Sequence, residues 1–451
     1  MFGYWLFPQM SLRLKKYLLL LGDIALFFSA LWLVVNFRYP NNTAYFFSLH
    51  FIPFSIILPV WLLIFYIAGL YEPKILKNNF DFLKTLSGAL GIGTLASIAF
   101  LYLTPVFGIT PRANLFLFLI TVFILEIIWR QTFNLLIYRQ ASSKVILIGS
   151  GPTTEEIASC LAGNPQLGYH VIERFPDRRL KDHLDRLENL IARQQASTIV
   201  IPADLKPQLI FVKSLYRKIN LNLDVIDTDL FYEKIFQKVP ISEIEESWFL
   251  ENITRNRKFY SLAKRVLEII LSAFLLILLS PLLLLIAAAV FISSPGGAIY
   301  GQRRVGRHEH PFTLFKFRSM VADAEADGAA RWASPHDPRL TRIGAFLRRV
   351  HLDELPQLWN IFKGELSFVG PRPERPEFTG QLQTTIPFYE LRHIVKPGVT
   401  GWAQINFRYG ASSTDARAKL EYELYYIKHR SLLFDALIIL RTLKTLFITP
   451  S

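Results

Sequence analysis

The sequence predicts a membrane protein of three parts: an α-helical transmembrane bundle, an α/β domain of the Rossmann-like kind, and an α-rich α+β domain with a re-entrant membrane helix. Three observations support this expectation. Four apolar runs open the 451-residue chain, a β-branched strand with a glycine turn follows, and a polar, motif-dense region comes after a fifth apolar run. The expected boundaries are 1–142, 143–256 and 257–451, with the re-entrant helix at about 262–292.

The four N-terminal runs lie near 17–35, 51–70, 83–103 and 115–136. Each approaches the roughly 20 apolar residues that cross a bilayer as a helix. Basic residues concentrate before the first run, between the second and third, and after the fourth, as is typical of cytoplasmic flanks. They are Arg13, Lys15, Lys16, Lys74, Lys77, Lys84, Arg130, Arg139 and Lys144. The N-terminus and everything after Lys144 are therefore expected in the cytoplasm.

The middle region opens with a short strand from Lys144, a turn at Gly149-Ser-Gly151, and a helical pattern. Segments 197–201 and 223–226 have the composition of further buried strands, with helical stretches between them as in a doubly wound sheet. A dinucleotide fingerprint requires a third glycine, and Thr154 occupies that position. A degenerate, regulatory or purely structural domain is therefore favoured over a nucleotide pocket.

The fifth apolar run, 266–292, has Ser280-Pro281 in its middle and basic residues near both ends. A proline inside a helix removes a backbone hydrogen bond and clashes with the preceding turn. A straight span would put basic clusters on both sides of the membrane, against the positive-inside tendency. These features favour a bent, re-entrant helix with both ends in the cytoplasm, and a kinked transmembrane helix is the alternative.

The net charge of +14 fits nucleic acid, an anionic membrane surface or anionic substrates as partners. No zinc-finger, helix-turn-helix or basic-region pattern is present, so nucleic acid is not expected. The only cysteine, Cys160, excludes an intrachain disulfide, as suits a protein that faces the cytoplasm.

The strongest local signal begins at Arg348, where Asp353 and Glu354 precede a helical pattern. Pro356 suits the first turn of that helix, and the free N–H groups at a helix start favour a phosphate. A carboxylate nucleophile needs nearby positive charge to approach an anionic phosphate, and Arg348 supplies it. For an isolated Asp-Glu pair, a solvated helix cap is the alternative explanation.

Further cations lie on either side of this stretch. Arg372 stands between Pro371 and Pro373, which fix the backbone and present the guanidinium rigidly, as a bidentate phosphate contact requires. Lys316 and Arg318 alternate with apolar residues and are expected on one face of a strand. A surface turn and a solvated strand are the respective alternatives.

Several ordered motifs of the C-terminal part resemble one family. They are Leu279-Ser280-Pro281, Gln302-Arg303-Arg304-Val305-Gly306, Lys316-Phe-Arg-Ser-Met320, Leu352-Asp-Glu-Leu-Pro-Gln357, Val369-Gly-Pro-Arg-Pro373 and Pro397-Gly-Val-Thr-Gly-Trp-Ala-Gln404. By these motifs the region 259–451 resembles the bacterial sugar transferase family, the monotopic polyprenyl-phosphate phosphoglycosyl transferases. The whole chain is similar to the long form, in which four helices and a Rossmann-like module precede the transferase.

The resemblance implies a ping-pong reaction that uses Mg²⁺. Asp353 would attack the β-phosphate of a UDP-hexose, release UMP and hold a covalent sugar phosphate. Glu354 would join Asp353 in binding the metal or would handle the proton of the acceptor, undecaprenyl phosphate. The residues expected to bind the substrate and its phosphates are Lys316, Arg318, Arg348, Arg372, Pro373, Glu374 and Gln404.

The resemblance also implies a location in the bacterial inner membrane, with contact to membrane lipids. It implies a re-entrant helix that is broken at Ser280 and Pro281, and a catalytic domain that faces the cytoplasm. The product would initiate exopolysaccharide, capsule or O-antigen assembly, and a homodimer is one option for the assembly of the protein. The motifs do not identify the hexose. A membrane-anchored nucleotide-sugar dehydratase or epimerase is the second hypothesis, although it needs an intact fingerprint and a Tyr-x-x-x-Lys pair. A non-enzymatic scaffold is the third.

Overall fold

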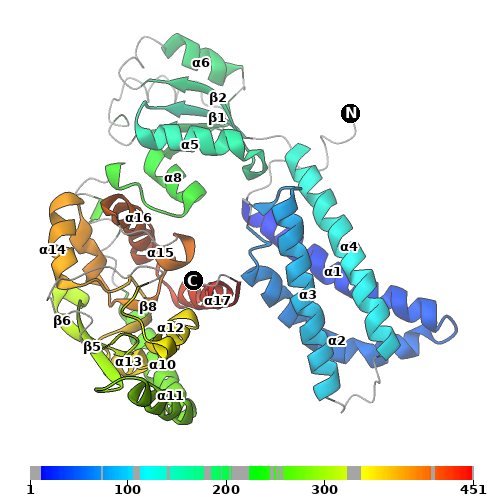
Figure 1. Cartoon of the computed structure of the whole chain (residues 1–451). Coiled ribbons are helices and arrows are strands. Elements are labelled where there is room, and N and C mark those ends of the chain that lie inside the picture. Colours follow the sequence, from blue (N-terminus) through cyan, green and yellow to red (C-terminus); the bar gives the residue numbers. More distant parts are fainter. Residues whose placement is uncertain are drawn as a thin grey trace. The chain divides into compact units, whose positions relative to one another are not determined.

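The computed structural model divides the chain into two compact units, Met1–Thr228 and Asp229–Ser451 (Figure 1). The second unit carries every candidate site residue. The described residues are 12–72, 75–104, 112–139, 143–176, 184–193, 196–202, 205, 223–243, 248–249, 252, 257–321, 337–407 and 412–448.

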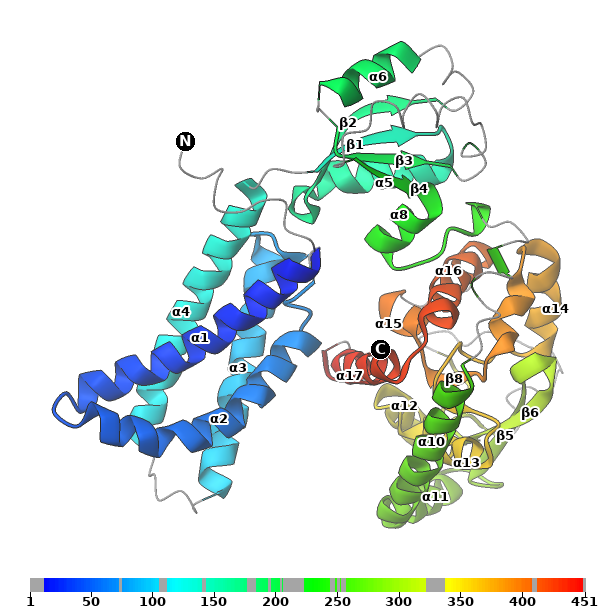
Figure 2. The same ribbon diagram turned by 180° about the vertical axis from the view of Figure 1, so that it is seen from behind.

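The first unit opens with four helices that are long and apolar enough to cross a membrane, which confirms the expectation from the sequence. They are α1 (Leu12–Arg38), α2 (Thr43–Ile67), α3 (Phe80–Leu103) and α4 (Arg112–Arg139). α1 packs against α2 and α4, and α2 also packs against α3 (Figure 2). The core between them is aromatic, since the ring of Phe27 lies 4.9–6.3 Å from those of Phe54, Trp61 and Phe118.

Buried charges connect these helices. Arg130 of α4 lies 2.5 Å from Asp23 of α1 and 3.7 Å from Glu126, and it donates to the Leu70 carbonyl at 2.8 Å. The Tyr71 hydroxyl donates to Asp23 at 2.6 Å. Because ionisable groups persist in such surroundings only when they are paired, this cluster fixes α1, α4 and the end of α2 in one arrangement.

The α/β domain contains a parallel four-stranded sheet in the order β2-β1-β3-β4. Its strands are β1 (Ser143–Ile148), β2 (Tyr169–Phe175), β3 (Thr198–Ile201) and β4 (Asp224–Asp227), and its helical elements are α5 (Pro152–Gly163), η3 (Pro165–Leu167) and α6 (Leu184–Ala192). Side chains alternate across a strand, so Ile146 and Ile148 of β1 face α6, where they pack with Leu187. Figure 1 shows α5 on the opposite face of the sheet.

One expectation for this region needs correction. The strand near 223–226 exists as β4, but it is partly exposed rather than buried, because it lies at the edge of the sheet. The two compact units meet at Thr228, so α8 (Thr228–Phe236) and η6 (Ile241–Glu243) belong almost entirely to the second unit. Pairing with the C-terminal domain is the reason, for Glu233 of α8 lies 2.7 Å from Lys428.

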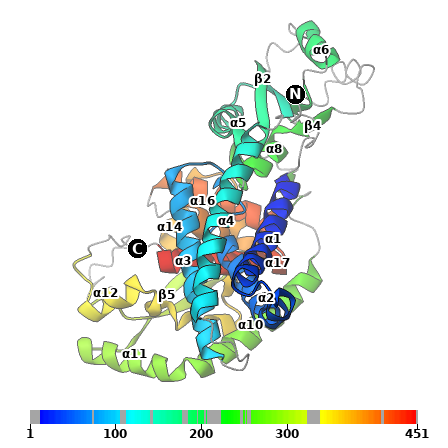
Figure 3. The ribbon, with the colours of Figure 1, turned by 90° about the vertical axis from the view of Figure 1, so that its right-hand side faces the viewer.

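The fifth apolar run forms two helices, α10 (Lys258–Leu278) and α11 (Ser280–Ser293), which meet at a bend of 62° (Figure 3). Leu279 leaves the helical backbone at the break, and Pro281 stands in the first turn of α11, where its missing N–H costs no hydrogen bond. The apolar run is thus interrupted at Leu279, directly before Ser280 and Pro281.

α10 has one side that contacts the C-terminal domain and one side that is exposed and apolar. Lys264 and Arg265 donate to backbone carbonyls of the C-terminal domain, and the buried Glu268 accepts from the Ser367 hydroxyl. The exposed apolar side chains of α10 are Phe259, Leu262, Val266, Leu267, Ile269, Ile270, Leu271, Phe274, Ile277 and Leu278. The polar side chains of the helix thus bind the domain, and the remaining side chains form an apolar surface.

The rest of the second unit is rich in short helices around two small sheets. The strands are β5 (Ile299–Val305) and β6 (Pro311–Phe317), which are antiparallel, and β7 (Ser367–Val369) and β8 (Gly398–Thr400), which are parallel. The helical elements are η7 (Arg307–Glu309), α12 (Arg342–Arg349), η8 (Leu352–Glu354), α13 (Gln357–Lys363), α14 (Pro376–Thr385), η9 (Tyr389–Ile394), α15 (Trp402–Asn406), α16 (Ser413–His429) and α17 (Leu432–Ile448).

Candidate active site

Asp353 and Glu354 lie in η8, a single 3-10 turn between α12 and α13. The chain enters this turn through His351, whose φ of 56° places it in the left-handed region. α13 has only seven residues and begins after Pro356, so the two acids occupy their own turn instead of capping a long helix. Their surroundings must therefore supply the positive charge that the sequence assigned partly to a helix start.

Two cations hold Glu354. Lys316 of β6 donates to Glu354 Oε1 at 2.7 Å, and Arg372 Nη2 donates to the same oxygen at 3.1 Å. Burial of Glu354 opposes its ionisation, but the charges of Arg372 and Lys316 outweigh this and hold its pKa well below its usual range. Glu354 is thus a fixed carboxylate, and the two ion pairs lock its position.

Among the described residues, Asp353, in contrast to Glu354, has no such hydrogen-bonded cations. Its side chain is buried, and within the part of the chain that the structure describes no group donates a hydrogen bond to it. Burial raises the pKa of Asp353, although Lys316 and Arg348 act in the other direction. A carboxylate that no donor occupies, close to positive charge, is chemically suited to attack an electrophile.

Arg348 reaches this region from the last turn of α12. Its Nε donates to the Ser319 hydroxyl at 2.9 Å, which orients the guanidinium, and its charge acts on Asp353. The structure thus brings Lys316, Arg348 and Arg372 together around Asp353 and Glu354.

Four other predicted residues have different contacts. Arg318 donates to the carbonyls of Ser294 and Pro295, both at 2.7 Å, and so ties the end of α11 to β6. The carbonyl of Pro373 accepts from Arg304, the backbone of Glu374 accepts from Val305, and the Gln404 amide donates to Val399. Their expected roles in binding substrate stay predictions.

Two residues near the site were missed from the sequence. Ser319 holds Arg348, and its place directly after Arg318 in a motif could have drawn attention to it. Asn360 of α13 is fully buried; it accepts from the Phe315 N–H at 3.0 Å and donates to the Thr313 carbonyl at 2.7 Å. It thereby fixes β6, and with it Lys316, against α13. An asparagine between Trp359 and Ile361 was the available signal, because buried polar groups are nearly always hydrogen-bonded.

A divalent metal would find few protein ligands here. The described residues contain no group of three or more His, Cys, Asp or Glu placed to hold a metal. Asp353 and the second oxygen of Glu354 remain as oxygen ligands, and Mg²⁺ is commonly bound by one or two carboxylates together with substrate phosphates. The two acids therefore fit Mg²⁺ that arrives with a phosphate ligand.

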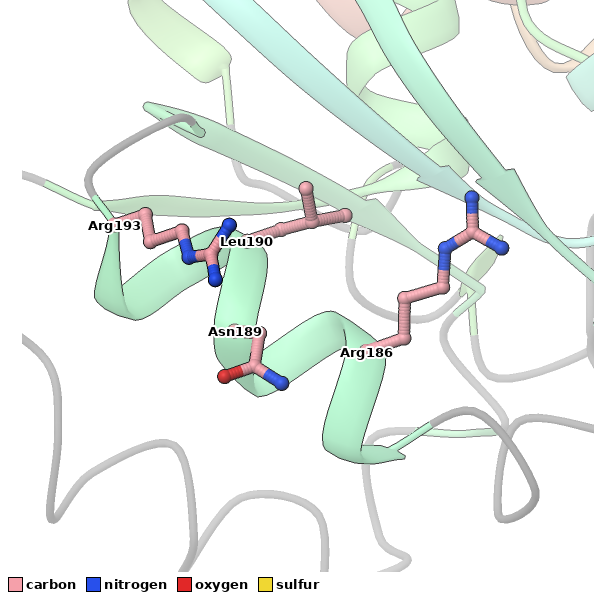
Figure 4. A pocket seen from close by; sticks show the side chains of 4 residues that line it. All are labelled: Arg186, Asn189, Leu190 and Arg193. Atoms are coloured by element: carbon pink, nitrogen blue, oxygen red, sulfur yellow. The ribbon is translucent and has the colours of Figure 1, made fainter.

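A separate hollow of about 350 Å³ lies on α6 of the first unit and is lined by Arg186, Asn189, Leu190 and Arg193 (Figure 4). Arg186 is already paired with Glu173 at 3.0 Å. Its four lining residues include no acid, unlike the turn of Asp353 and Glu354.

A bent apolar helix pair and two acids surrounded by cations characterise a membrane-associated protein with a site for anionic groups. In agreement with this, residues 259–449 match the model of the family described as bacterial sugar transferase. The chain belongs to this family.

Three relatives illustrate the similarity. The UDP-N-acetylgalactosamine-undecaprenyl-phosphate N-acetylgalactosaminephosphotransferase of Aeromonas hydrophila is 43% identical over 42% of this chain and 44% of its own length. The undecaprenyl-phosphate glucose phosphotransferase of Komagataeibacter xylinus is 33% identical over 68% of this chain and 59% of its own length. The UDP-glucose:undecaprenyl-phosphate glucose-1-phosphate transferase of Caulobacter vibrioides is 39% identical over 42% of this chain and 72% of its own length. The chain thus matches less than two thirds of the first two relatives.

Proposed function

We propose that this protein transfers a hexose-1-phosphate from a UDP-sugar to undecaprenyl phosphate and releases UMP. The observation that carries the proposal is the contrast between the two adjacent acids: Glu354 is held by Lys316 and Arg372, whereas Asp353 has no hydrogen-bond donor among the described residues. The names of the three relatives, all undecaprenyl-phosphate sugar phosphotransferases, support the choice of donor and acceptor.

The proposed transfer has two displacements. In the first, a carboxylate oxygen of Asp353 bonds to the β-phosphorus, and the bond to the bridging oxygen breaks, so that UMP leaves with the electron pair. In the second, a phosphate oxygen of the lipid attacks the same phosphorus and the bond to Asp353 breaks. Splitting the transfer in this way means that the two anionic substrates need not share the site. Lys316, Arg348 and Arg372 offset the negative charge in both steps.

The low pKa of Glu354 favours one of its two expected roles. A general base works best when its pKa lies near the operating pH, and the cations around Glu354 hold its pKa far below that range. Holding Mg²⁺ together with Asp353 is therefore the proposed role, and proton transfer is not. When bound, Mg²⁺ would offset charge on the transferring phosphate.

We also propose that α10 and α11 form one re-entrant helix. Lys264 and Arg265 near the start of α10 bind carbonyls of the C-terminal domain. Near the end of α11, Ile286 and Val290 pack with Leu347 of that same domain. Both ends of the bent pair thus return to one body, as a helix that enters and leaves on the cytoplasmic side of the inner membrane requires. Assembly as a homodimer stays a prediction.

Incubation of the purified protein with undecaprenyl phosphate, Mg²⁺ and a panel of UDP-hexoses tests the function. Release of UMP with one of these sugars, together with formation of the lipid-linked sugar diphosphate, is expected. If no sugar of the panel gives UMP while the folded protein is intact, the proposed reaction is wrong.

A further inference from the structure

Two cations, the half-buried Lys264 and the buried Arg392, hold the segment Val369–Arg372 at its two ends. Lys264 Nζ donates to the Val369 carbonyl at 2.7 Å, and Arg392 Nη2 donates to the Arg372 carbonyl at 2.9 Å. Among the described residues, neither cation forms a hydrogen bond or an ion pair with Asp353 or Glu354. Both reach the site only through the backbone that carries Arg372.

The anchor at Arg372 is a dense polar cluster. Arg392 is paired with Glu423 through two hydrogen bonds of 2.9 and 2.8 Å, and it also donates to the Tyr389 hydroxyl. Only 4% of either side chain of the Arg392–Glu423 pair is exposed. A buried ion pair is often no more stable than a well-packed apolar pair, so stability alone does not explain why a guanidinium is placed here. Its fork, however, can bind Glu423 and a backbone carbonyl together, which an apolar side chain cannot do.

The anchor at Val369 belongs to the membrane helix. Lys264 of α10 contacts the Tyr426 hydroxyl at 2.9 Å and lies 3.0 Å from Asp435, in addition to its bond with Val369. The apolar surface of α10 and the position of the Arg372 loop are therefore mechanically connected through one side chain.

Between its anchors the segment has little freedom. A Cβ at Gly370 would lie 2.4 Å from the Lys396 carbonyl, so the backbone is pressed against β8 at this point. The Gly370 N–H donates to Thr400 and the Pro371 carbonyl accepts from Gly398, at 2.9 and 2.8 Å. With prolines on both sides of Arg372 restricting φ, the place of its guanidinium follows from where the segment is anchored.

We propose that Lys264 and Arg392 are positioning residues, which keep Arg372 on Glu354 and on the phosphate of the substrate. The second half of this statement rests on the proposed function. A shift of about 1 Å at a catalytic group can lower the rate by roughly a hundredfold, so loss of either anchor should reduce turnover strongly without removing any group from the site.

The test is a double-mutant cycle in the full-length protein. Arg392→Lys keeps the charge beside Glu423 but cannot reach both Glu423 and the Arg372 carbonyl. We expect it to lower kcat roughly ten- to a hundredfold in the wild-type background and less than about twofold in an Arg372→Ala background, because it acts through Arg372. Equal factors in both backgrounds would overturn the proposal. Lys264→Gln is the second variant, for use if Arg392→Lys does not fold.

Lys428→Met is the matched control, because it removes another buried ion pair of the same unit, to Glu233, without touching the Arg372 segment. It should lower stability but leave kcat unchanged. Hydrogen exchange separates the proposal from the proposed function: in Arg392→Lys the Gly370 amide should exchange faster while the Phe315 amide stays protected. Faster exchange without any sugar transfer by the wild type would refute the function and retain the anchor, whereas unchanged exchange would refute the anchor.

Discussion

At the scale of single residues, the structure gives the two adjacent acids opposite environments. The sequence predicted both as site residues, with Arg348 one turn upstream, whereas Lys316 was expected on a strand face and Arg372 in a proline turn, and only the family motifs assigned them to one site. It could not predict which acid is held and which is unoccupied, since that depends on partners 38 and 18 residues away from Glu354.

Asp353→Asn should abolish transfer and leave the protein at least as stable as before. An amide is a poor nucleophile, and it removes a carboxylate that burial disfavours, as the raised pKa of Asp353 indicates. The measurements are UMP release and the melting temperature. Wild-type protein should also exchange labelled UMP into UDP-sugar without lipid, and a strict requirement for the lipid would exclude the covalent intermediate.

Glu354→Gln should have the opposite effect on stability. Its pKa is lower in the folded state than the usual value, so its contribution is present at neutral pH and is lost as the pH falls through the folded-state pKa. Loss of the charged partner of Lys316 and Arg372 should lower the free energy of unfolding by about 1–3 kcal/mol at pH 7. The difference from wild type in denaturant unfolding should shrink toward acid pH; a constant difference would contradict the assignment.

His393 gives a pH dependence that is independent of the two acids. Burial and the charge of Arg392 lower its pKa to about 4, although Glu309 acts against them. Because the unfolded chain has a His pKa near 6.5, unfolding takes up a proton below that pH, and stability falls between pH 6.5 and 4. The loss should reach about 2 kcal/mol at pH 5. His393→Asn should flatten this part of the unfolding curve, and an unchanged slope would place the titration elsewhere.

At the scale of elements, apolar runs predicted the four N-terminal helices and Ser280-Pro281 predicted the break between α10 and α11, because composition and proline act locally. The pairing of α8 with α16 and the cluster around Arg392 were not predictable in the same way. Arg392 and Glu423 are 31 residues apart, and no local pattern indicates that their side chains meet.

The bend leads to a prediction about topology. In a Cys160→Ser background, cysteines placed at the exposed Phe259 and at Arg303 should both react with a membrane-impermeant reagent only from the cytoplasmic side. Basic residues at both ends of the apolar pair are the physical reason. A cysteine at Lys144, which is expected in the cytoplasm, should show the same labelling pattern as both ends of the pair. Labelling of one end of the pair from the side opposite to Lys144 would show a transmembrane helix instead.

At the scale of the whole molecule, the α/β domain supplies no described residue of the candidate site. Its glycine turn also differs from a dinucleotide loop, because Thr154 stands where such a loop has its third glycine. Thr154 is buried, and its hydroxyl would lie 2.9 Å from a Cβ at Gly149, a residue with a φ of 127°. The structural or regulatory role of this domain stays a prediction.

The C-terminal unit needs more than the sequence-predicted domain 257–451. Val239, Ile241 and Trp248 lie in its main apolar core. The Val239 N–H donates to the Glu421 carbonyl, the Gln237 carbonyl accepts from Trp402 Nε1 at 2.9 Å, and Glu233 pairs with Lys428. Each buried apolar side chain of this size contributes about 1.5–3 kcal/mol, so loss of the segment should cost more than about 4 kcal/mol.

Two truncated chains make this testable. A chain of residues 229–451 keeps every candidate site residue and the whole core, so in membranes it should fold and release UMP within a fewfold of the full-length rate. A chain of residues 257–451 keeps the same site but exposes the surface that the segment covers, and its melting temperature should be lower by roughly 10 °C or more. The pair isolates the 28 residues between the two starting points, because both chains lack the N-terminal helices and the sheet. Equal melting temperatures would mean that the segment does not stabilise the domain. If the longer chain were folded but inactive, the first unit would take a direct part in the reaction.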